Sequence, residues 1–546
     1  MAQDNKISEK WQRFNEQVWS STKLELTLDV SRMDLPDGIF DDMASKMNDA
    51  FDAMAALEAG AEANEDEHRM VGHYWLRNPE IAPTAEIKQQ ILQARKDVAD
   101  FVGQVHFGSL RSPSGKPFRN LILMGIGGSI LGPQLLQAAL SGPNDKMRLW
   151  TMDNTDPDGI YRILRRLHQE LDRTLCVVTS KSGRTMETMN ALAETKAAMG
   201  RVGLKFAKHA VAVTMPGSEL DQRATSEGWL ASFPVWDWVG GRTSLFSPVG
   251  ILPAALLGLD VDALLQGAAR MDEATRLHDL RNNPAAMLAV AWYDATERRG
   301  LREMVIEPYK DRLEPWSRYA QQLVMESLGK RQTQDGKEVL SGMAVYGNKG
   351  STDQHSVLQH LCEGPGGFFV TFIHVMRDLC GAAWASGGAF DVEVEVRPGI
   401  ATGDCLLALL LGTRSALHDK SRPSISLFVD RLDAMSLGEI VALYERAVGY
   451  YASLVGINAY NQPGVEESKR RAGRALDIQL KAMAALKARQ PEPATAGQIA
   501  VEADLVGWEE TVYLILRHLA SNPTRGVRRR KASRPADELF FWERGS

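Results

Sequence analysis

A polar segment directly after an apolar run has the residue types that bind a phosphate group. The apolar, β-branched run Leu175–Val178 predicts a buried strand, and a helix is expected from residue 186 onward. Between them stand three hydroxyls and an amine, on Ser180, Lys181, Ser182 and Thr185. Together with free backbone N–H groups at a helix start, these donors suit a phosphate monoester. The alternative is an ordinary helix start, capped by Thr185.

A glycine-rich segment, Gly125-Ile-Gly-Gly-Ser129, follows a second predicted strand at 121–124. It invites comparison with a dinucleotide-binding loop, but Ile130 stands where the third glycine is required. A nicotinamide cofactor is therefore disfavoured, and no cofactor is expected. Small residues instead permit close approach of the backbone to a ligand, with the Gly128 N–H and the Ser129 hydroxyl as donors.

An arginine leaves a glycine turn in the segment Trp236–Ser247. Gly240 and Gly241 make the turn, and Arg242 follows at once. One interpretation pairs Arg242 with the nearby Asp237. The glycine pair favours the other, in which Arg242 is a fixed cation directed into a cleft.

Acid–base residues occur farther along the chain. Gln322 and Glu326 are spaced by four in a predicted helix, which places both on one face. His355 ends a glycine-rich loop, and Gln462 and Lys469 are seven residues apart near a helix start. Taken singly, such a histidine is more commonly a surface or core residue, and such a lysine a surface residue.

The predicted elements that position these residues alternate between strand and helix in two successive runs, which indicates parallel α/β sheets. Ligands bind beyond the carboxyl ends of such strands, where the loops at 125–129 and 180–185 are expected. The predicted segments are a helical N-terminal segment (1–110), two α/β domains (111–284 and 285–460), a C-terminal helix (461–490) and an extension (491–546).

The extension contains a linker at 491–497, two short helices at 498–505 and 509–520, and a basic run, Arg525–Lys531. Paired helices before a basic run would fit a winged-helix DNA-binding domain. Near-neutral helices and the acidic chain instead favour a helical docking module or a solvated basic tail. Nucleic acid is not an expected partner.

The composition is that of an ordinary globular protein. The 546 residues are 44% hydrophobic and 24% charged, with a formal charge of −6. The four cysteines, Cys176, Cys362, Cys380 and Cys405, are scattered, so neither a disulfide framework nor a metal site is expected. The first ten residues lack an apolar signal core and no apolar run reaches membrane-spanning length, so a cytoplasmic location without membrane association is expected.

Five stretches together resemble the glucose-6-phosphate isomerase (phosphoglucose isomerase) family. They occur in the family's order, and they are Gly125–Pro133, Ser180–Thr188, Trp236–Ser247, Gln322–Lys330 with Gly350–His355, and Asn461–Lys469. The resemblance implies two tandem sugar-isomerase (SIS) α/β/α domains with parallel sheets and helical N-terminal and C-terminal additions. It also implies a homodimer whose site is shared across the interface.

The resemblance further implies roles for individual residues. Glu326 would carry a proton between C1 and C2 of the open-chain sugar, and Arg242 would stabilise the cis-enediolate. His355 and Lys469 would open the ring. The phosphate would be held by Ser180, Lys181, Ser182 and Thr185, with Gly128, Ser129, Glu187, Gly241, Gln322 and Gln462 lining the site. No metal is required for this chemistry.

The expected activity is therefore reversible isomerisation of glucose 6-phosphate and fructose 6-phosphate. One alternative is an isomerase that also accepts mannose 6-phosphate. Another is a non-catalytic phosphosugar-binding regulator, which the joint presence of Glu326, Arg242 and His355 disfavours. The chain departs from the family pattern at Ser182-Gly183, Thr243 and Leu328. These departures bear on affinity and lineage rather than on the reaction.

Overall fold

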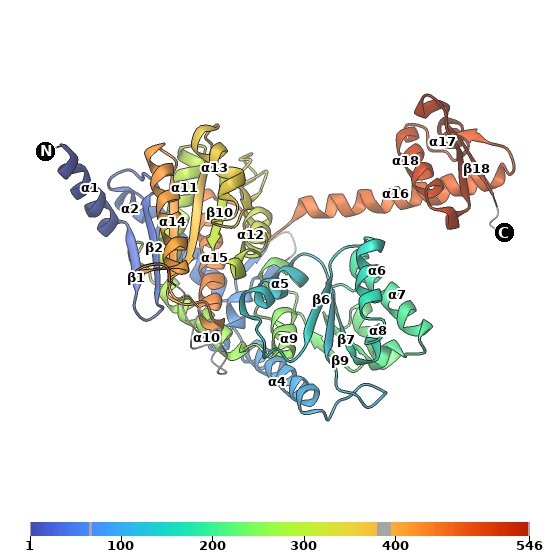
Figure 1. Cartoon of the computed structure of the whole chain (residues 1–546), viewed down its shortest axis with the longest axis horizontal. Coiled ribbons are helices and arrows are strands. Elements are labelled where there is room, and N and C mark those ends of the chain that lie inside the picture. Colours follow the sequence, from blue (N-terminus) through green and yellow to red (C-terminus); the bar gives the residue numbers. More distant parts are fainter. Residues whose placement is uncertain (1, 65–67, 379–394, 544–546) are drawn as a thin grey trace. The chain divides into compact units, whose positions relative to one another are not determined.

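The computed structural model of the chain describes residues 2–64, 68–378 and 395–543. Cys380, one of the four cysteines, lies outside these ranges. The chain divides into two compact units, Met1–Asn461 and Gln462–Ser546 (Figure 1). The first unit contains two large sheets and the second contains one small sheet.

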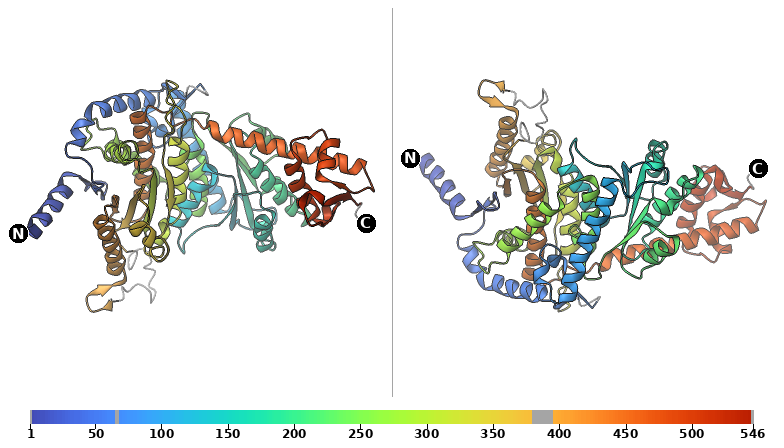
Figure 2. Two further views of the ribbon diagram at one scale, coloured as in Figure 1. Left: turned by 90° about the horizontal axis from the view of Figure 1, so that it is seen from above. Right: turned by 90° about the horizontal axis from the view of Figure 1, so that it is seen from below.

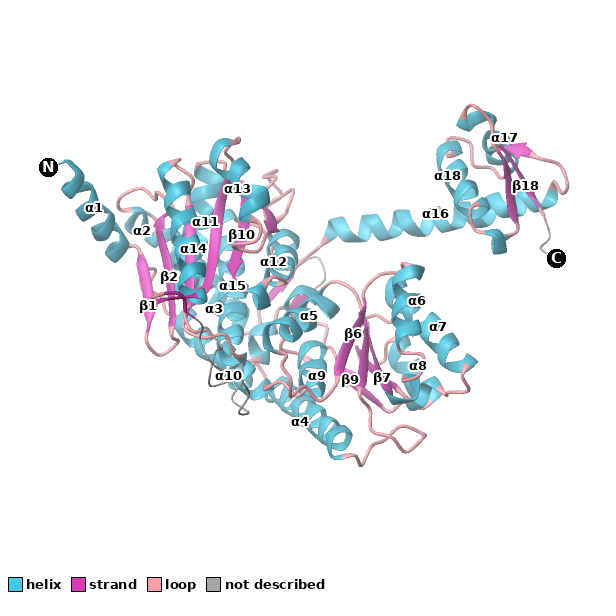
Figure 3. Ribbon diagram, in the orientation of Figure 1, coloured by secondary structure: helices cyan, strands magenta, loops and turns pink. Residues whose placement is uncertain are grey.

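The first sheet has five parallel strands in the order β6-β5-β7-β8-β9. The strands are β5 (Asn120–Met124), β6 (Arg148–Met152), β7 (Thr174–Thr179), β8 (Ala210–Thr214) and β9 (Ala231–Pro234). Every residue of the central strands β5, β7 and β8 is buried, because helices cover both faces of the sheet (Figure 3). The predicted alternation of strand and helix in this region is confirmed.

The second sheet has six strands in the order β1-β2-β15-β12-β10-β11. Its strands are β1 (Val18–Ser21), β2 (Leu26–Arg32), β10 (Glu303–Tyr309), β11 (Ala344–Gly347), β12 (Phe368–Val375) and β15 (Ser424–Val429). The last four are parallel, whereas β2 pairs antiparallel with β15 and β1 antiparallel with β2. The N-terminal segment 1–110, predicted to be helical, also contains strands, because β2 lies in this sheet and is almost wholly buried.

Fifteen α-helices are described in the first unit. They are α1 (Ala2–Glu16), α2 (Ile39–Asp42), α3 (Ala44–Glu58), α4 (Ala85–Phe107), α5 (Gly128–Leu140), α6 (Pro157–Arg166), α7 (Met186–Arg201), α8 (Glu219–Glu227), α9 (Pro248–Leu257), α10 (Val261–Thr275), α11 (Pro284–Tyr293), α12 (Trp316–Gln321), α13 (Gln354–Glu363), α14 (Thr402–Asp419) and α15 (Ala434–Val455). Two short strand pairs, β3 (Glu62–Asn64) with β4 (Arg69–Met70) and β13 (Glu395–Arg397) with β14 (Ile400–Ala401), form separate hairpins, the second of which stands out from the unit (Figure 2).

Helix α15 is a long helix of the first unit that is almost wholly buried. Nearly every one of its residues is inaccessible to solvent, which explains its mainly apolar sequence. It packs against α3, α10 and α11. Its one fully buried arginine, Arg446, donates hydrogen bonds to Glu58 and Asp272, so the charge is paired where solvent cannot reach it.

The second unit contains three helices and a three-stranded antiparallel sheet. In chain order its elements are α16 (Pro463–Ala488), β16 (Ala494–Thr495), α17 (Ala496–Glu502), α18 (Glu509–Ala520), β17 (Val527–Arg530) and β18 (Leu539–Trp542). The basic run at 525–531, interpreted from sequence as part of a tail, contains strand β17, and the expected linker contains strand β16. Both strands pair with β18, which follows the basic run.

Candidate active site

The candidate site lies in the first unit, where the loops after β5 and β7 leave the carboxyl edge of the first sheet. Gly127 has a positive φ of 57° and precedes α5, and the polar loop after β7 precedes α7. Both loops therefore end in helix N-termini, which carry unpaired backbone N–H groups and favour anions. This agrees with the anion-binding geometry expected from the sequence.

Close backbone contact joins the first loop to the arginine turn. A side-chain carbon added at Gly128 would lie 1.8 Å from the Gly241 carbonyl oxygen, so only glycine fits there. A carbon added at Gly127 would lie 2.9 Å from Nε2 of Gln322. Gly127 and Gly128 thus allow three segments, distant in sequence, to meet.

Arg242 and Glu326 form the centre of this meeting point. Nη1 of Arg242 donates to Oε1 of Glu326 at 2.8 Å, and Nε2 of Gln322 donates to Oε2 of the same carboxylate at 2.9 Å. The Arg242 side chain is 6% exposed and that of Glu326 is 18% exposed. Each carboxylate oxygen thus has its own donor, and the carboxylate is held in one orientation while part of it stays accessible.

Gln322 and Glu326 lie in a π-helical turn that continues α12. Such turns interrupt a regular helix and occur frequently at functional sites. The two side chains still face the same side, as their spacing predicts, and they are joined by the hydrogen bond described above. Arg242 pairs with Glu326 and not with Asp237, so the interpretation of Arg242 as a cation directed into the site agrees with the geometry.

Backbone carbonyls fix the other side of the arginine. Nη2 of Arg242 donates to the carbonyl oxygens of Ala459 at 2.6 Å and Asn461 at 3.1 Å. Lys330 donates to the Glu326 carbonyl at 2.7 Å and to the Asn461 carbonyl at 3.0 Å. The segment 459–461 therefore connects the arginine with the helix that carries the carboxylate.

Aromatic rings, one buried and one partly buried, pack at the 459–461 segment. Tyr460 is part of this segment, and its ring lies 6.2 Å from that of His73. Burial lowers the pKa of His73 well below its ordinary value, and the neighbouring Arg77 and Arg446 act in the same direction. Burial raises the pKa of Tyr460 to about 12. Both rings are thus neutral near pH 7, and they add no charge behind Arg242.

The predicted phosphate loop is ordered by its own hydroxyls. The Ser180 and Thr185 hydroxyls are 3.0 Å apart, and the Gly183 N–H donates to Ser180 Oγ at 3.1 Å. Gly183 has a positive φ of 74°, and an added side-chain carbon would lie 2.4 Å from the Leu220 nitrogen. The Arg184 N–H donates to the exposed Ser182 at 3.2 Å.

Lys181 has a connecting function that the sequence did not indicate. Its Nζ donates to the carbonyl oxygens of Asp237 at 2.7 Å and Val239 at 3.1 Å. These carbonyls belong to the segment that turns into Arg242. Lys181 thus ties the loop after β7 to the arginine turn as well as adding positive charge nearby.

The remaining predicted residues are more dispersed. Ser129 and Glu187 are the second residues of α5 and α7, and each is partly exposed. His355 is the second residue of α13 and is exposed, and no contact described in the structure joins it to Glu326. Gln462 and Lys469 belong to the second unit, at the start of α16.

Lys330 contacts the backbone of the candidate site but was not among the site residues predicted from the sequence. It is 7% exposed and bonds to the backbone at Glu326 and Asn461. The available signal was its position four residues after Glu326, on the same helical face. A lysine is usually expected at the surface, so burial of Lys330 could not be inferred from its type.

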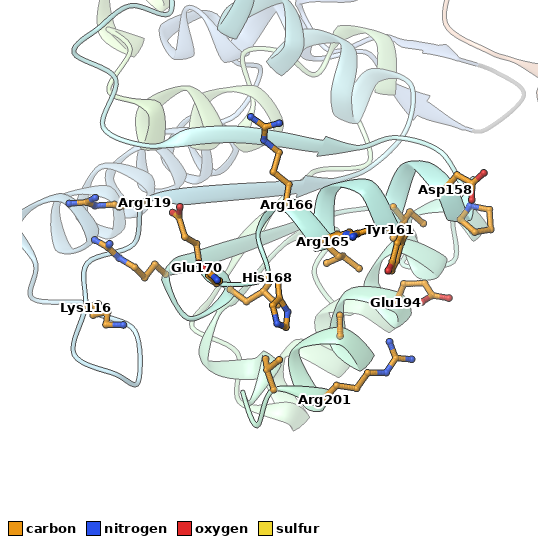
Figure 4. Close-up of a pocket in the computed structure, with 18 residues that line it drawn as sticks. Lys116, Arg119, Asp158, Tyr161, Arg165, Arg166, His168, Glu170, Glu194 and Arg201 are labelled. Atoms are coloured by element: carbon orange, nitrogen blue, oxygen red, sulfur yellow. The ribbon is translucent and has the colours of Figure 1, made fainter.

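A separate cavity of about 1060 Å³ lies away from this site (Figure 4). It is lined by α6, by the C-terminal part of α7 and by residues that precede β5 and β7, including Arg119 and His168. It is therefore at the amino edge of the first sheet, whereas the candidate site is at the carboxyl edge.

In residues 2–64, 68–378 and 395–543, no three His, Cys, Asp or Glu side chains are grouped in a way that could hold a metal ion. Within the same ranges no helix has the length and apolar character needed to span a bilayer.

The family profile and the sequence relatives that match this chain carry names for the same enzyme. The phosphoglucose isomerase family profile matches residues 29–380 and 400–499. A glucose-6-phosphate isomerase of Citrifermentans bemidjiense is 50% identical over 517 residues, covering 95% of this chain and 96% of that protein. One from Desulfitobacterium hafniense is 48% identical over 539 residues, covering 99% of each.

Solved structures agree with these sequence matches. The crystal structure of a glucose-6-phosphate isomerase from Chlamydia trachomatis superposes with a TM-score of 0.76 at 26% identity, covering 86% of this chain and 91% of that one. A hypothetical protein from Thermus thermophilus gives a TM-score of 0.67 at 27% identity, covering 83% of this chain and 99% of that one. The fold predicted from the tandem α/β pattern is confirmed, and the chain belongs to the phosphoglucose isomerase family.

Proposed function

We propose that this protein catalyses the reversible isomerisation of glucose 6-phosphate and fructose 6-phosphate. The observation that carries the proposal is the carboxylate of Glu326, held by Arg242 on one oxygen and Gln322 on the other. The relatives described above are named for this activity. Hydrogen bonds to both oxygens hold the carboxylate in one orientation, as a base that takes a proton from carbon requires.

The central step moves one proton between adjacent carbons. Glu326 removes the proton from C2 of the open-chain aldose, and the electron pair forms a C1–C2 double bond while O1 takes the negative charge. Arg242 is placed to stabilise that charge. Glu326 then returns the proton to C1 while the proton of the C2 hydroxyl passes to O1, which leaves a carbonyl at C2 and gives the ketose. A positioned base contributes roughly 10²–10⁴-fold to such a step.

Ring opening and substrate anchoring complete the proposed cycle. His355 and Lys469 transfer protons at O5 and O1 as the C1–O5 bond breaks. The loop with Ser180, Ser182 and Thr185 holds the phosphate, with Lys181 bracing it against the arginine turn. Gly128, Ser129, Glu187, Gly241 and Gln462 line the site.

The proposed assembly is a homodimer that shares its site between subunits. His355 is exposed near the start of α13 and is not joined to Glu326 by a described contact, which supports its action in the site of a second copy. The domain limits 111–284 and 285–460 are part of the same proposal. Because sugar phosphates are charged and do not cross bilayers unaided, the cytoplasm is the expected compartment.

Isomerisation in heavy water tests the chemistry directly. Starting from fructose 6-phosphate, a proton-transfer mechanism introduces deuterium at C2 of the product, whereas hydride transfer between the carbons introduces none. Full turnover without deuterium would contradict the role of Glu326. The same assay with mannose 6-phosphate examines the substrate range, and the assay with a chelator examines metal dependence. The absence of turnover of both glucose 6-phosphate and fructose 6-phosphate would overturn the proposed activity.

A further inference from the structure

The C-terminal unit has the element order and strand order of a winged-helix domain. Its elements follow as α16, β16, α17, α18, β17 and β18, and its sheet has the order β16-β18-β17. In that architecture α17 and α18 are the helix-turn-helix pair, and the connection between β17 and β18 is the wing. The family profile ends at residue 499, before α18 and the wing begin.

The unit has a hydrophobic core of its own. Ile499 of α17, Leu516 of α18, Val527 of β17 and Phe540 of β18 are fully buried in one cluster. The ring of Phe540 meets that of Tyr513 edge to face at 6.0 Å. Each element therefore buries residues against the others, and the unit is a packed domain.

The charge of this unit is opposite to that of the rest of the chain. Residues 462–546 contain 15 Lys and Arg residues against 11 Asp and Glu residues, a formal charge of +4. The whole chain carries −6, so residues 1–461 carry −10. A basic module on an acidic protein indicates an acidic partner for that module.

A cluster of cations lies in β17 and at the start of the wing. Arg528 pairs with Glu543 and Arg529 with Glu538, so these two stabilise the hairpin. Arg530, Lys531 and Arg534 are exposed, and none has an acidic partner within residues 395–543 or the other described ranges. Three neighbouring cations that repel one another form a surface that a polyanion would neutralise.

We propose that this wing binds duplex nucleic acid through the phosphates of its backbone. Helix α18 begins with the exposed acids Glu509 and Glu510, which repel phosphate at the end where such helices usually approach the groove. Binding therefore rests on the wing and does not read base sequence. The expectation from sequence that nucleic acid is not a partner depended on the near-neutral helices and on the acidic overall charge, and the overall charge conceals the basic module.

The test is fluorescence anisotropy of the full-length protein with a random-sequence DNA duplex of about 30 base pairs, measured from about 50 to 200 mM salt. The wing variant Arg530→Ala/Lys531→Ala/Arg534→Ala is expected to bind at least about tenfold more weakly. Its slope of log affinity against log salt is expected to fall by about 2.7, or 0.9 for each lost phosphate contact.

A matched control removes three exposed cations from the first unit, in Lys23→Ala/Lys96→Ala/Arg281→Ala. It makes the same charge change and is expected to bind DNA as the wild type does. The variant Glu510→Gln is expected to strengthen binding, because a repulsive charge is removed. Isomerase activity should be unchanged in all three, which separates this proposal from the catalytic one.

Several results would overturn the proposal. The first is that the wild type does not bind the duplex at about 50 mM salt. The second is that the wing variant and the control variant lose the same amount of DNA affinity. The third is that inorganic polyphosphate displaces the protein from DNA as well as unlabelled duplex does at the same phosphate concentration. The first would point to a protein-docking module, and the last to general adhesion of polyanions. If the wing variant loses the secondary structure of the unit, Arg534→Glu alone, at an exposed loop position, provides the decisive comparison.

Discussion

Arg242 donates a hydrogen bond of 2.8 Å to Glu326, a residue 84 positions away in the sequence. The arginine is fixed on its other side by the carbonyls of Ala459 and Asn461. The residue proposed as the base and the cation proposed to stabilise the reaction's negative charge are therefore in direct contact. An arginine held in place by three hydrogen-bond partners is preorganised, which is the condition for effective electrostatic catalysis.

Replacing the carboxylate tests its role as a base. Glu326→Gln keeps the size of the side chain and one acceptor for Arg242, but it cannot take a proton. We expect kcat to fall by roughly 10²–10⁴-fold with KM nearly unchanged. Steady-state kinetics of the variant provides the measurement. Glu338→Gln, at an exposed surface pair, is the control, and near-normal turnover in Glu326→Gln would exclude Glu326 as the base.

Two single variants separate phosphate binding from loop positioning. Thr185→Ala removes a hydroxyl from the proposed phosphate site, so we expect a higher KM with kcat kept, because a phosphate held there would be bound equally in ground and transition states. Lys181→Ala also releases the carbonyls of Asp237 and Val239, which precede Arg242, so both KM and kcat should change. Identical kinetic effects in the two variants would contradict this distinction.

The contact between Gly128 and Gly241 can be tested by adding one methyl group. Gly128→Ala places a carbon against the Gly241 carbonyl, and we expect the loops to separate and kcat/KM to fall at least about tenfold. Gly200→Ala is the control, because no atom lies within 4 Å of the added carbon. Activity assays and thermal unfolding of both variants give the answer. Full activity in Gly128→Ala would show that the loop contact is dispensable.

The buried Glu307 predicts a pH dependence of stability. Burial, with help from the nearby Asp353, raises its pKa from 4.5 to about 7. The folded protein therefore keeps a proton that the unfolded chain releases above pH 4.5. Its contribution to the free energy of unfolding is present in full below about pH 4.5 and is lost as pH rises to about 7.

Glu307→Gln should remove this dependence without adding charge. Between pH 4.5 and 7, the stability difference between variant and wild type is expected to change by up to about 1.4 kcal/mol per pH unit, in favour of the variant at higher pH. Denaturant unfolding at several pH values measures it, with Glu338→Gln as the exposed control. Parallel pH profiles for wild type and Glu307→Gln would contradict the prediction.

Local patterns predicted much of the fold because they reflect burial of neighbouring residues. The apolar run Leu175–Val178 became a fully buried strand, and the spacing of Gln322 and Glu326 became a hydrogen bond. Strand β2 was missed because polar residues interrupt its apolar pattern. One of these, Asp29, is buried and pairs with Arg414, a partner that only the folded chain reveals.

The candidate site was predicted less completely from the sequence, because its contacts join residues that are far apart in the chain. The types of Arg242 and Glu326 indicated chemistry, but their pairing depends on a contact across the fold. The bridging positions of Lys181 and Lys330 depend on carbonyls that no side-chain pattern encodes. In the C-terminal unit, β17 resembled a solvated tail because Arg528 and Arg529 pair with acids that follow it in sequence.

The position of β2 beside β15 has a consequence for biosynthesis. Residues 26–32 leave the ribosome early, yet their partner at 424–429 is made only after most of the polypeptide. During that interval the N-terminal strand has an unsatisfied edge and exposed apolar side chains, which are features that invite aggregation. Completion of the second sheet should therefore be a late event, and nascent chains shorter than about 430 residues should depend on chaperones.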